Sequence, residues 1–251
     1  MVPIMASKLT PAFFRLVYDA ARSRDSPVIL ELGTQRGQQP GRTKVFLAAC
    51  EETGGTLVSI DIKDCSNVSD APNFILVQSD SIAVANIVKQ APILSQGIHM
   101  VFVDTVRVRA HLEKEVAGWW PFIKSEGWLF CRGVDPGPYR RGSYKDAIVL
   151  EKESEERARM EFFLANPDSC DLAIHYGSTG LAVLRKWSAI GTPSNPPVSL
   201  PGRPIGSLAL YATRKARRRL LSLVSGRPRW TNKFRAWSEL RHGVGDEPKP
   251  A

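Results

Sequence analysis

Short apolar runs alternate with helix-like segments along most of the chain, and this alternation limits the fold more than any other feature of the sequence. The apolar runs occupy residues 27–33, 56–61, 73–80, 98–104 and 127–132. The segments with helical signals are residues 10–22, 43–53, 81–90, 109–123 and 143–166. Because continuous apolar strands belong to parallel sheets with helices on both faces, this order predicts a doubly wound α/β fold.

The C-terminal third of the chain departs from this alternation. Residues 170–177 and 179–186 are strand-like and joined by a short turn rich in glycine, which predicts an antiparallel hairpin. The sheet is then Rossmann-like, seven-stranded and mostly parallel. Residues 191–206 contain five prolines and three glycines and are expected to form a linker. We therefore expect a domain over residues 1–190, this linker, and an extension over residues 207–251.

The positive charge of the chain is concentrated in the extension. The whole sequence has a net charge of +9, and residues 201–251 hold 12 Lys/Arg against 3 Asp/Glu, so the rest of the chain is neutral overall. An enzyme that binds nucleic acid over its whole surface would not show this division. No apolar run reaches the roughly 18 residues of a membrane span. The four scattered cysteines are expected to be reduced thiols of a cytoplasmic protein.

Apolar residues of the extension recur at helical spacing. Leucines and alanines share a face over residues 208–223, and Trp230, Phe234 and Trp237 follow at i, i+4 and i+7 among basic residues. A basic amphipathic helix with aromatic anchors suits an anionic membrane surface, and hence peripheral membrane association, or an acidic protein partner. RNA is a weaker alternative. Packing on the domain or on a second identical subunit is the remaining one.

The first apolar run ends in a turn, Gly33-Thr34-Gln35-Arg36-Gly37, where a doubly wound sheet binds ligands. Glycines there let a ligand approach the backbone, although a strand-to-helix turn favours glycine for structural reasons as well. The spacing fits neither the GxxxxGK[ST] loop of nucleotide phosphates nor the GxGxxG loop of nicotinamide cofactors. Thr43 is expected to cap the helix that follows.

Acidic residues lie in or at the ends of the first three predicted strands. Asp61 is placed to accept hydrogen bonds from both hydroxyls of a ribose, or is a solvated turn residue. Asp80 is placed to reach an adenine amino group, to cap the next helix, or both. Glu31 lies inside the first strand, where a buried acid needs a partner, and a ligand ammonium is one such partner.

This order of motifs resembles that of class I S-adenosylmethionine-dependent methyltransferases. The motifs are E-x-G-x-x-x-G, a strand-end Asp, Ser-Asp, "VFVD", "GWLF" and "GLAVLRK", and the resemblance covers roughly residues 10–187. The nearest subgroup is the small O-methyltransferases that act on sugars, antibiotics and other secondary metabolites. The resemblance implies S-adenosylmethionine as cofactor. Around it would lie Glu31, Gly33, Thr34 and Gly37 at the methionine part, Asp61 at the ribose, and Ser79, Asp80 and Ser81 at the adenine.

The residues opposite the cofactor depart from this subgroup. The fourth strand of the subgroup ends in an Asp-Gly-Asp-His type run and the fifth in His-Asp, whereas here Asp104 is followed by Thr-Val-Arg and the fifth strand ends in Arg132-Gly133. Asp104, Asp135 and His111 remain as catalytic residues, and two acids are a weak basis for a divalent metal. Three interpretations stay open: proximity with His111 or Asp135 as base, a nucleophile that needs little deprotonation, or lost activity.

Arginines flank the expected active-site edge. If the loops converge, they form a basic rim for a phosphate or carboxylate of the substrate; separate surface arginines are the alternative. The residues concerned are Arg107 and Arg132, with Arg109, Arg140 and Arg141. The sequence thus favours O-methylation of a small-molecule or glycan-type acceptor. The competing interpretations are a catalytically degenerate binding module whose tail recruits a partner, and an RNA methyltransferase.

Overall fold

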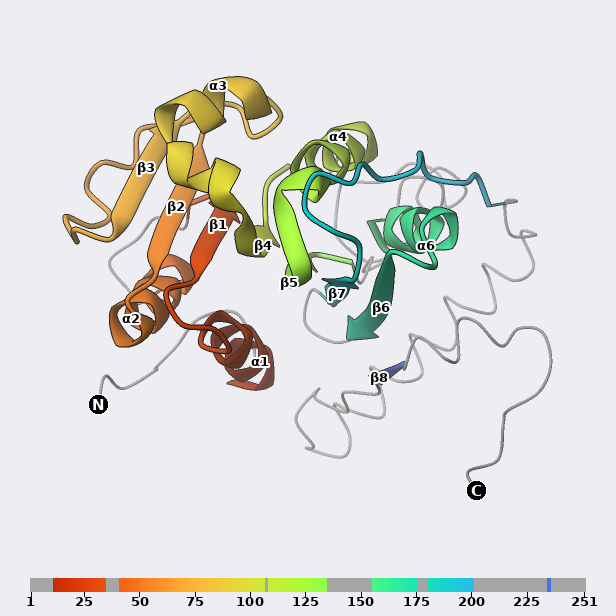
Figure 1. Cartoon of the computed structure of the whole chain (residues 1–251), viewed down its shortest axis with the longest axis horizontal. Helices are drawn as coiled ribbons and strands as arrows, with labels where there is room; N and C mark the ends of the chain where they lie inside the picture. Colours follow the sequence, from red (N-terminus) through yellow and green to blue (C-terminus); the bar gives the residue numbers. More distant parts are fainter. Residues whose placement is uncertain are drawn as a thin grey trace, which may run out of the picture.

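A single sheet runs through the middle of the molecule, and helices cover both of its faces (Figure 1). The computed structural model describes residues 11–34, 41–106, 108–134, 155–175, 180–200 and 234–235. Over these residues the sheet has eight strands in the order β3-β2-β1-β4-β5-β7-β6-β8. The doubly wound α/β fold predicted from the sequence is confirmed.

The first five strands are parallel and the sheet ends in antiparallel strands. The strands are β1 (Val28–Leu32), β2 (Thr56–Asp61), β3 (Phe74–Gln78), β4 (Ile98–Val103), β5 (Ile123–Arg132), β6 (Cys170–His175), β7 (Leu181–Lys186) and β8 (Phe234–Arg235). β7 inserts between β5 and β6 and pairs antiparallel with both. The predicted hairpin is therefore confirmed. β5 starts four residues earlier than predicted, because Ile123 already pairs with Ile98 before the register shifts.

The helices also follow the sequence pattern, with differences at their starts. They are α1 (Pro11–Ala21), α2 (Arg42–Thr53), α3 (Val84–Gln90), α4 (Arg109–Trp119) and α6 (Glu155–Ala165). The prediction that Asp80 caps a helix is wrong, because α3 begins only at Val84, after a turn in which Asp80 Oδ1 accepts a hydrogen bond from the Ile82 amide. The prediction for Thr43 is also wrong: Gly41 is the cap position of α2, and the Thr43 hydroxyl donates to Glu31 instead.

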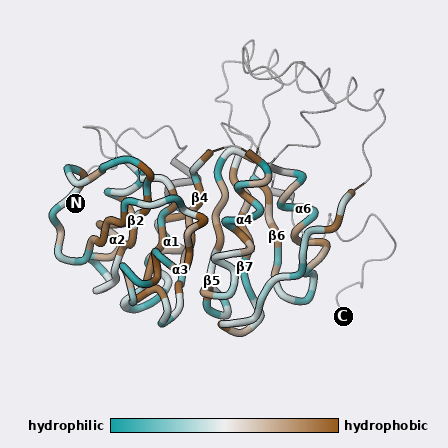
Figure 2. The backbone as a smooth tube through the Cα atoms, turned by 90° about the horizontal axis from the view of Figure 1, so that it is seen from above, coloured by the Kyte–Doolittle hydropathy of each residue, from teal (hydrophilic) through white to brown (hydrophobic). Residues whose placement is uncertain are grey.

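Two apolar layers hold the helices against the sheet. On one face, α1 and α2 pack on β1, β2 and β4 through side chains that include Val17, Phe46 and Phe102. On the other face, α3, α4 and α6 pack through a second cluster that includes Trp119 and Phe162. The two sets of helices lie on opposite sides of the sheet in Figure 1, and the strands between them carry most of the hydrophobic colour in Figure 2. The four cysteines are free and buried, as expected of reduced thiols.

The strand order reverses between β1 and β4, which makes their carboxyl ends the topological switch point of the sheet. Gly33 follows β1 with a φ of +89°, and a Cβ on it would lie 2.5 Å from the Asp104 carbonyl oxygen. Both features exclude a larger residue. The close approach of the β1 and β4 backbones is thus itself a reason for glycine here.

The chain after β7 returns to α6. Residues 191–200 form neither helix nor strand, but the Asn195 amide donates to Asn166 Oδ1 at 2.7 Å and the Leu200 amide to Glu161 Oε1 at 2.8 Å. Of the predicted basic extension, only Phe234 and Arg235 are described, and they pair with β6 as the extended strand β8. A helical face through Phe234 is therefore wrong at these two residues. No helix among the described residues has the length and apolar character that crossing a bilayer requires.

Candidate functional site

Most of the residues predicted to bind a cofactor meet at the carboxyl edge of the sheet. Backbone hydrogen bonds join the strand ends there. The Asp104 amide donates to the carbonyl oxygen of Leu32 at 3.0 Å, and the Ser79 amide donates to the carbonyl oxygen of Asp61 at 3.0 Å. The residues on this edge are Glu31, Gly33, Thr34, Asp61, Ser79, Asp80, Ser81, Asp104 and Arg132. Gly37, Arg107, Asp135, Arg140 and Arg141 lie outside the described residues.

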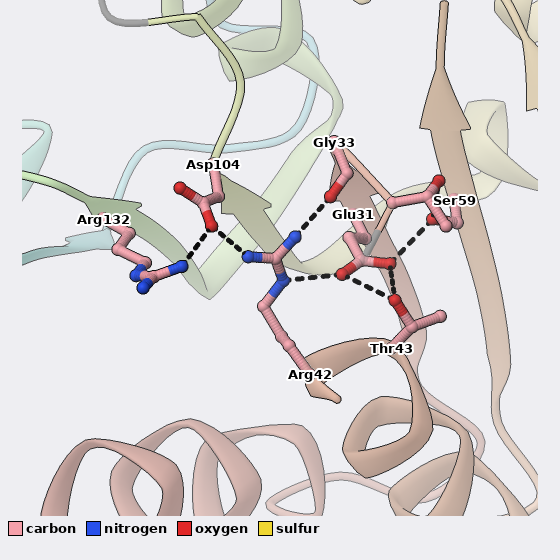
Figure 3. Close-up of polar contacts among 8 residues, drawn as sticks. Glu31, Gly33, Arg42, Thr43, Ser59, Asp104 and Arg132 are labelled. Atoms are coloured by element: carbon pink, nitrogen blue, oxygen red, sulfur yellow. Dashed lines mark hydrogen bonds and ion pairs between the residues drawn. The ribbon is translucent and has the colours of Figure 1, made fainter. Parts of the chain in front are cut away.

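Glu31 is completely buried and has protein partners for both carboxylate oxygens. Ser59 donates to Oε2 at 2.7 Å, and Thr43 donates to Oε2 at 2.8 Å (Figure 3). The Nε of Arg42 donates to Oε1 at 2.6 Å. Thr34 is also buried and shares a 2.8 Å hydrogen bond with Ser59. The buried acid thus has a cation and two hydroxyls around it, all supplied by the chain.

Arg42 links Glu31 to the end of β4. Its Nη1 donates to Asp104 Oδ2 and its Nη2 to the carbonyl oxygen of Gly33 (Figure 3). Arg132, at the end of β5, donates to the same Oδ2 of Asp104 at 2.6 Å. We call Glu31, Arg42, Asp104 and Arg132 the charged cluster. It has two acids and two guanidinium groups, so its formal charge is zero.

Arg42 and Arg132 lower the pKa of the Asp104 carboxyl group. Burial alone would raise the pKa of this carboxyl, but the charges and hydrogen bonds of Arg42 and Arg132 outweigh burial and lower the pKa below its ordinary value. A carboxylate with a depressed pKa and two cationic partners is a weak proton acceptor. This geometry makes Asp104 a poor general base.

The two acids on the β2 and β3 side have a different environment. Asp61 Oδ1 accepts a hydrogen bond from the Lys63 amide at 2.9 Å, so a local turn orients its carboxylate at the end of β2. Asp80 is oriented by the Ile82 amide at 3.2 Å, and half of its side chain is exposed. Neither carboxylate is buried. Both are accessible to hydroxyl or amino groups of a ligand.

A second polar cluster joins the β3 and β4 ends to α4. Ser81 donates to Glu115 Oε1 at 2.5 Å, and Thr105 donates to Glu115 Oε2 at 2.9 Å. His111 Nε2 lies 3.1 Å from the Ser81 hydroxyl and 3.3 Å from Glu115. Burial raises the pKa of Glu115, and the hydrogen bonds from Ser81 and Thr105 offset this only in part. The acid and the hydroxyl contact the same imidazole nitrogen, so the cluster lacks the relay order of a Ser-His-acid triad.

The arginines predicted to form a basic rim have acidic partners where they are described. Arg109 donates to Glu113 at 2.7 Å and also to the buried Glu161, and Arg132 donates to Asp104. Their charges are therefore compensated within the chain. Among the described residues, no group of three or more His, Cys, Asp or Glu side chains could hold a metal ion.

Sequence reasoning missed Arg42 and Glu115, which organise the two clusters. The only signal for Arg42 was that a buried Glu31 requires a partner. That signal does not identify which cation pairs with it. For Glu115, the signal was its spacing of four residues from His111, which places both on one helix face. Both residues are buried charges, and most of their partners lie on other elements of the fold, so these contacts could not be read from local pattern.

Comparisons with known proteins identify the fold. No protein-family model matches the sequence, and no curated protein matches it. Among solved structures, the MycE methyltransferase of mycinamycin biosynthesis, in complex with Mg and SAH, superposes with a TM-score of 0.53 at 19% identity. A complex of MycE that also holds mycinamycin VI gives 0.53 at 18% identity. A Staphylococcus aureus protein assigned to the caffeoyl-CoA O-methyltransferases gives 0.51 at 13% identity.

The matched regions are of similar extent. The match to MycE covers 71% of this chain and 49% of the MycE chain, so the chain accounts for about half of that protein's length. The match to the Staphylococcus aureus protein covers 71% of this chain and 84% of the other. These likenesses, with the strand order above, show that the chain has the Rossmann-like fold of class I S-adenosylmethionine-dependent methyltransferases.

Proposed function

We propose that this protein is an S-adenosylmethionine-dependent methyltransferase that transfers the methyl group to a small-molecule or glycan-type acceptor, with a hydroxyl oxygen as the accepting atom. The observation that carries the proposal is the position of Asp61 and Asp80 at neighbouring strand ends beside the β1/β4 switch point of a methyltransferase fold. The fold alone does not define an activity. The residues at the edge therefore carry the functional argument.

The residues on the β2 and β3 side suit the adenosyl part of the cofactor. Asp61 offers a half-buried carboxylate whose oxygens can accept hydrogen bonds from both ribose hydroxyls. Asp80 offers an exposed carboxylate for the adenine amino group, next to Ser79 and Ser81. Local turns already orient both carboxylates, so binding a ligand there costs little reordering of side chains.

The methionine part of the cofactor is less well matched. Glu31 is fully buried and already paired with Arg42, and the Gly33 carbonyl also accepts a hydrogen bond from Arg42. A ligand ammonium would therefore share the Gly33 carbonyl with Arg42, and it could reach Glu31 only by opening the buried ion pair. The fit to S-adenosylmethionine thus rests on its adenosyl end.

When bound, S-adenosylmethionine supplies an electrophilic methyl group. The chain must then align an acceptor and accept its proton where the acceptor needs deprotonation. Asp104 is a weak base because Arg42 and Arg132 lower its pKa. His111, one-fifth exposed and in contact with Ser81, is the described residue best suited to hold that proton. Asp135 remains a prediction from the sequence.

The acceptor class rests on the fold neighbours and on the neutral charge of the domain. The structure of MycE with mycinamycin VI is one of a methyltransferase with a small-molecule ligand, and the excess positive charge of this chain lies outside the domain. A small hydroxylated acceptor agrees with both observations better than RNA does.

Product formation tests the proposal. The full chain is incubated with S-adenosylmethionine and a panel of sugar, phenolic and macrolide acceptors, and S-adenosylhomocysteine and methylated product are measured by mass spectrometry. One or more acceptors should give both products in equal amounts, and Asp61→Ala should lower the rate. The exposed variant Asp70→Ala is the matched control and should keep it. Cofactor binding without turnover on any acceptor class would favour the binding-module interpretation.

The charge division supports a separate role for the C-terminal extension. We propose that residues 207–251 attach the protein peripherally to an anionic surface, since they hold 11 Lys/Arg against 3 Asp/Glu and so most of the excess positive charge. The full chain should sediment together with anionic liposomes, and about 0.5 M salt should release it into the supernatant. Retention on neutral liposomes to the same degree would contradict an electrostatic role.

A further inference from the structure

Three acceptors at the switch point each accept a hydrogen bond from the same side chain. The three guanidinium nitrogens of Arg42 donate to Glu31, to Asp104 and to the carbonyl oxygen of Gly33, each nitrogen to a different group (Figure 3). Only 3% of the Arg42 side chain is exposed. These acceptors come from β1, from the turn after it and from the end of β4. Together they are the set that a cation lying between the two strand ends would use.

We infer that Arg42 takes the place of a ligand ammonium group, so that the protein recognises an S-adenosyl ligand by its adenosyl end and gains almost no affinity from the ligand's amino group. The inference rests on the proposed function, because it concerns the same cofactor. It makes Arg42 a specificity-determining residue. The ligand class that follows is adenosyl thioethers and sulfonium compounds, with or without an amino-acid end.

Charge balance supports this inference. The charged cluster of Glu31, Arg42, Asp104 and Arg132 is already neutral, with one guanidinium group for each carboxylate. A ligand ammonium near Asp104 would add a third cation beside two guanidinium groups. Like charges at such short range in a poorly solvated place repel strongly. The ligand's amino group is therefore better placed in solvent than in the cluster.

Contacts with Phe102 and Glu31 hold the Arg42 side chain in its position between the strand ends. Its guanidinium carbon lies 4.8 Å from the centre of the Phe102 ring, and Phe102 is completely buried in β4. A guanidinium stacked on an aromatic face gains cation–π energy in addition to its hydrogen bonds. If Arg42 moved away to admit a ligand, Glu31 would lose its cation, and that residue has no exposure to water. Breaking a buried ion pair in this way is costly.

The acceptors on the adenosyl side lie nearer the surface than those of the charged cluster. The Asp61 carboxylate is half-buried and half of the Asp80 side chain is exposed, whereas the Arg42–Glu31 pair is almost completely buried. A ligand contact to Asp80 therefore breaks no buried ion pair. We expect affinity to depend mainly on the adenosyl contacts and little on the amino-acid end.

Titration calorimetry on the full chain with two ligands tests the inference. S-adenosylhomocysteine has the amino-acid end, whereas 5′-methylthioadenosine is an adenosyl thioether without it. The two dissociation constants should agree within about fivefold, which is about 1 kcal/mol. Tighter binding of S-adenosylhomocysteine by more than this factor would overturn the inference. Failure of both ligands to bind at about 1 mM would instead overturn the proposed function on which it rests.

The variant Arg42→Met sharpens the test. It frees Glu31, Asp104 and the Gly33 carbonyl for a ligand ammonium, so the preference for S-adenosylhomocysteine over 5′-methylthioadenosine should rise about tenfold or more. The matched control is Arg24→Met, which removes a half-exposed arginine that pairs with Glu126 at the surface, and it should leave the preference unchanged. No rise in a folded Arg42→Met protein would overturn the inference. If this variant does not fold, the wild-type comparison still decides.

Discussion

Arg42 and Glu31 form an ion pair that is almost entirely buried, with Nε of Arg42 2.6 Å from Oε1 of Glu31. The pair connects β1 to Arg42, the first residue of α2. Because Arg42 also contacts Asp104, one side chain fixes the positions of the β1 and β4 ends relative to each other. The stability of the fold and the shape of the candidate site therefore depend on the same contacts.

Removing one member of this pair should destabilise the protein strongly. Glu31→Gln should lower the free energy of unfolding by about 3 to 5 kcal/mol, because a buried guanidinium loses its counter-charge. Urea unfolding measures the effect, and the exposed Glu51→Gln is the control, with an expected change of at most about 0.5 kcal/mol. The double variant Glu31→Gln/Arg42→Gln should cost less than the sum of the single changes. Simple additivity would show that the two residues do not act as a pair.

Gly33 should be intolerant of a side chain for two separable reasons. Gly33→Ala introduces a residue at a φ of +89° and places its Cβ 2.5 Å from the Asp104 carbonyl oxygen. Gly191→Ala is the matched control, since its φ of +85° brings the same strain and nothing lies within 4 Å of the added Cβ. Gly33→Ala should therefore cost about 1 to 3 kcal/mol more than Gly191→Ala in thermal or urea unfolding. Equal costs would mean that the backbones at the switch point can separate without penalty.

The depressed pKa of Asp104 predicts a loss of stability in acid. A carboxyl whose folded-state pKa is lowered stabilises the protein above its unfolded-state pKa, here 3.8, and this contribution is lost as the pH falls through the lower folded-state value. The stability difference between wild type and Asp104→Asn should be largest at neutral pH and shrink below about pH 4. Asp70→Asn, at an exposed site, should show no such trend. A difference that stays constant down to pH 3 would contradict the effect of the two arginines.

Glu115 should behave in the opposite sense. Burial raises its pKa above 4.5, so its contribution to stability is full below that pH and decreases as the pH rises toward the folded-state value. Glu115→Gln removes this ionisation and can keep hydrogen bonds to Ser81 and Thr105. The stability of the variant relative to wild type should therefore increase between pH 4.5 and pH 7.5. A relative decrease over that range would show that the carboxylate is better stabilised than burial allows.

The sequence predicted the fold because the alternation of apolar runs and helices is a local signal. The runs around Leu30 and Val101 are apolar at nearly every position, which only a doubly covered parallel strand requires. Phe234 shows the limit of such reasoning. Its spacing from Trp230 and Trp237 suits a helix, but its backbone pairs with β6, and a contact with a strand some 60 residues away leaves no periodic trace.

The positions of the candidate site residues could be predicted from the sequence, but their ionic partners could not. Strand-end residues such as Asp61 and Asp104 were found because a parallel sheet brings all its carboxyl ends to one edge. Their ionic partners were not, since Arg42 and Arg132 reach Asp104 from other elements. The expectation of a basic rim failed to foresee these partners for the same reason. Whether a charge is compensated depends on three-dimensional contacts that sequence spacing does not encode.

Calorimetric titration of the full chain with S-adenosylhomocysteine is the most direct test of an adenosyl site in this protein. We expect saturable binding at one site, and Asp61→Ala should weaken it by about 1 to 3 kcal/mol, or roughly 5- to 150-fold, because a ribose would lose its carboxylate partner. Asp70→Ala should bind as the wild type does. Absence of binding at about 1 mM ligand, or unchanged affinity in Asp61→Ala, would contradict an adenosyl site at the end of β2.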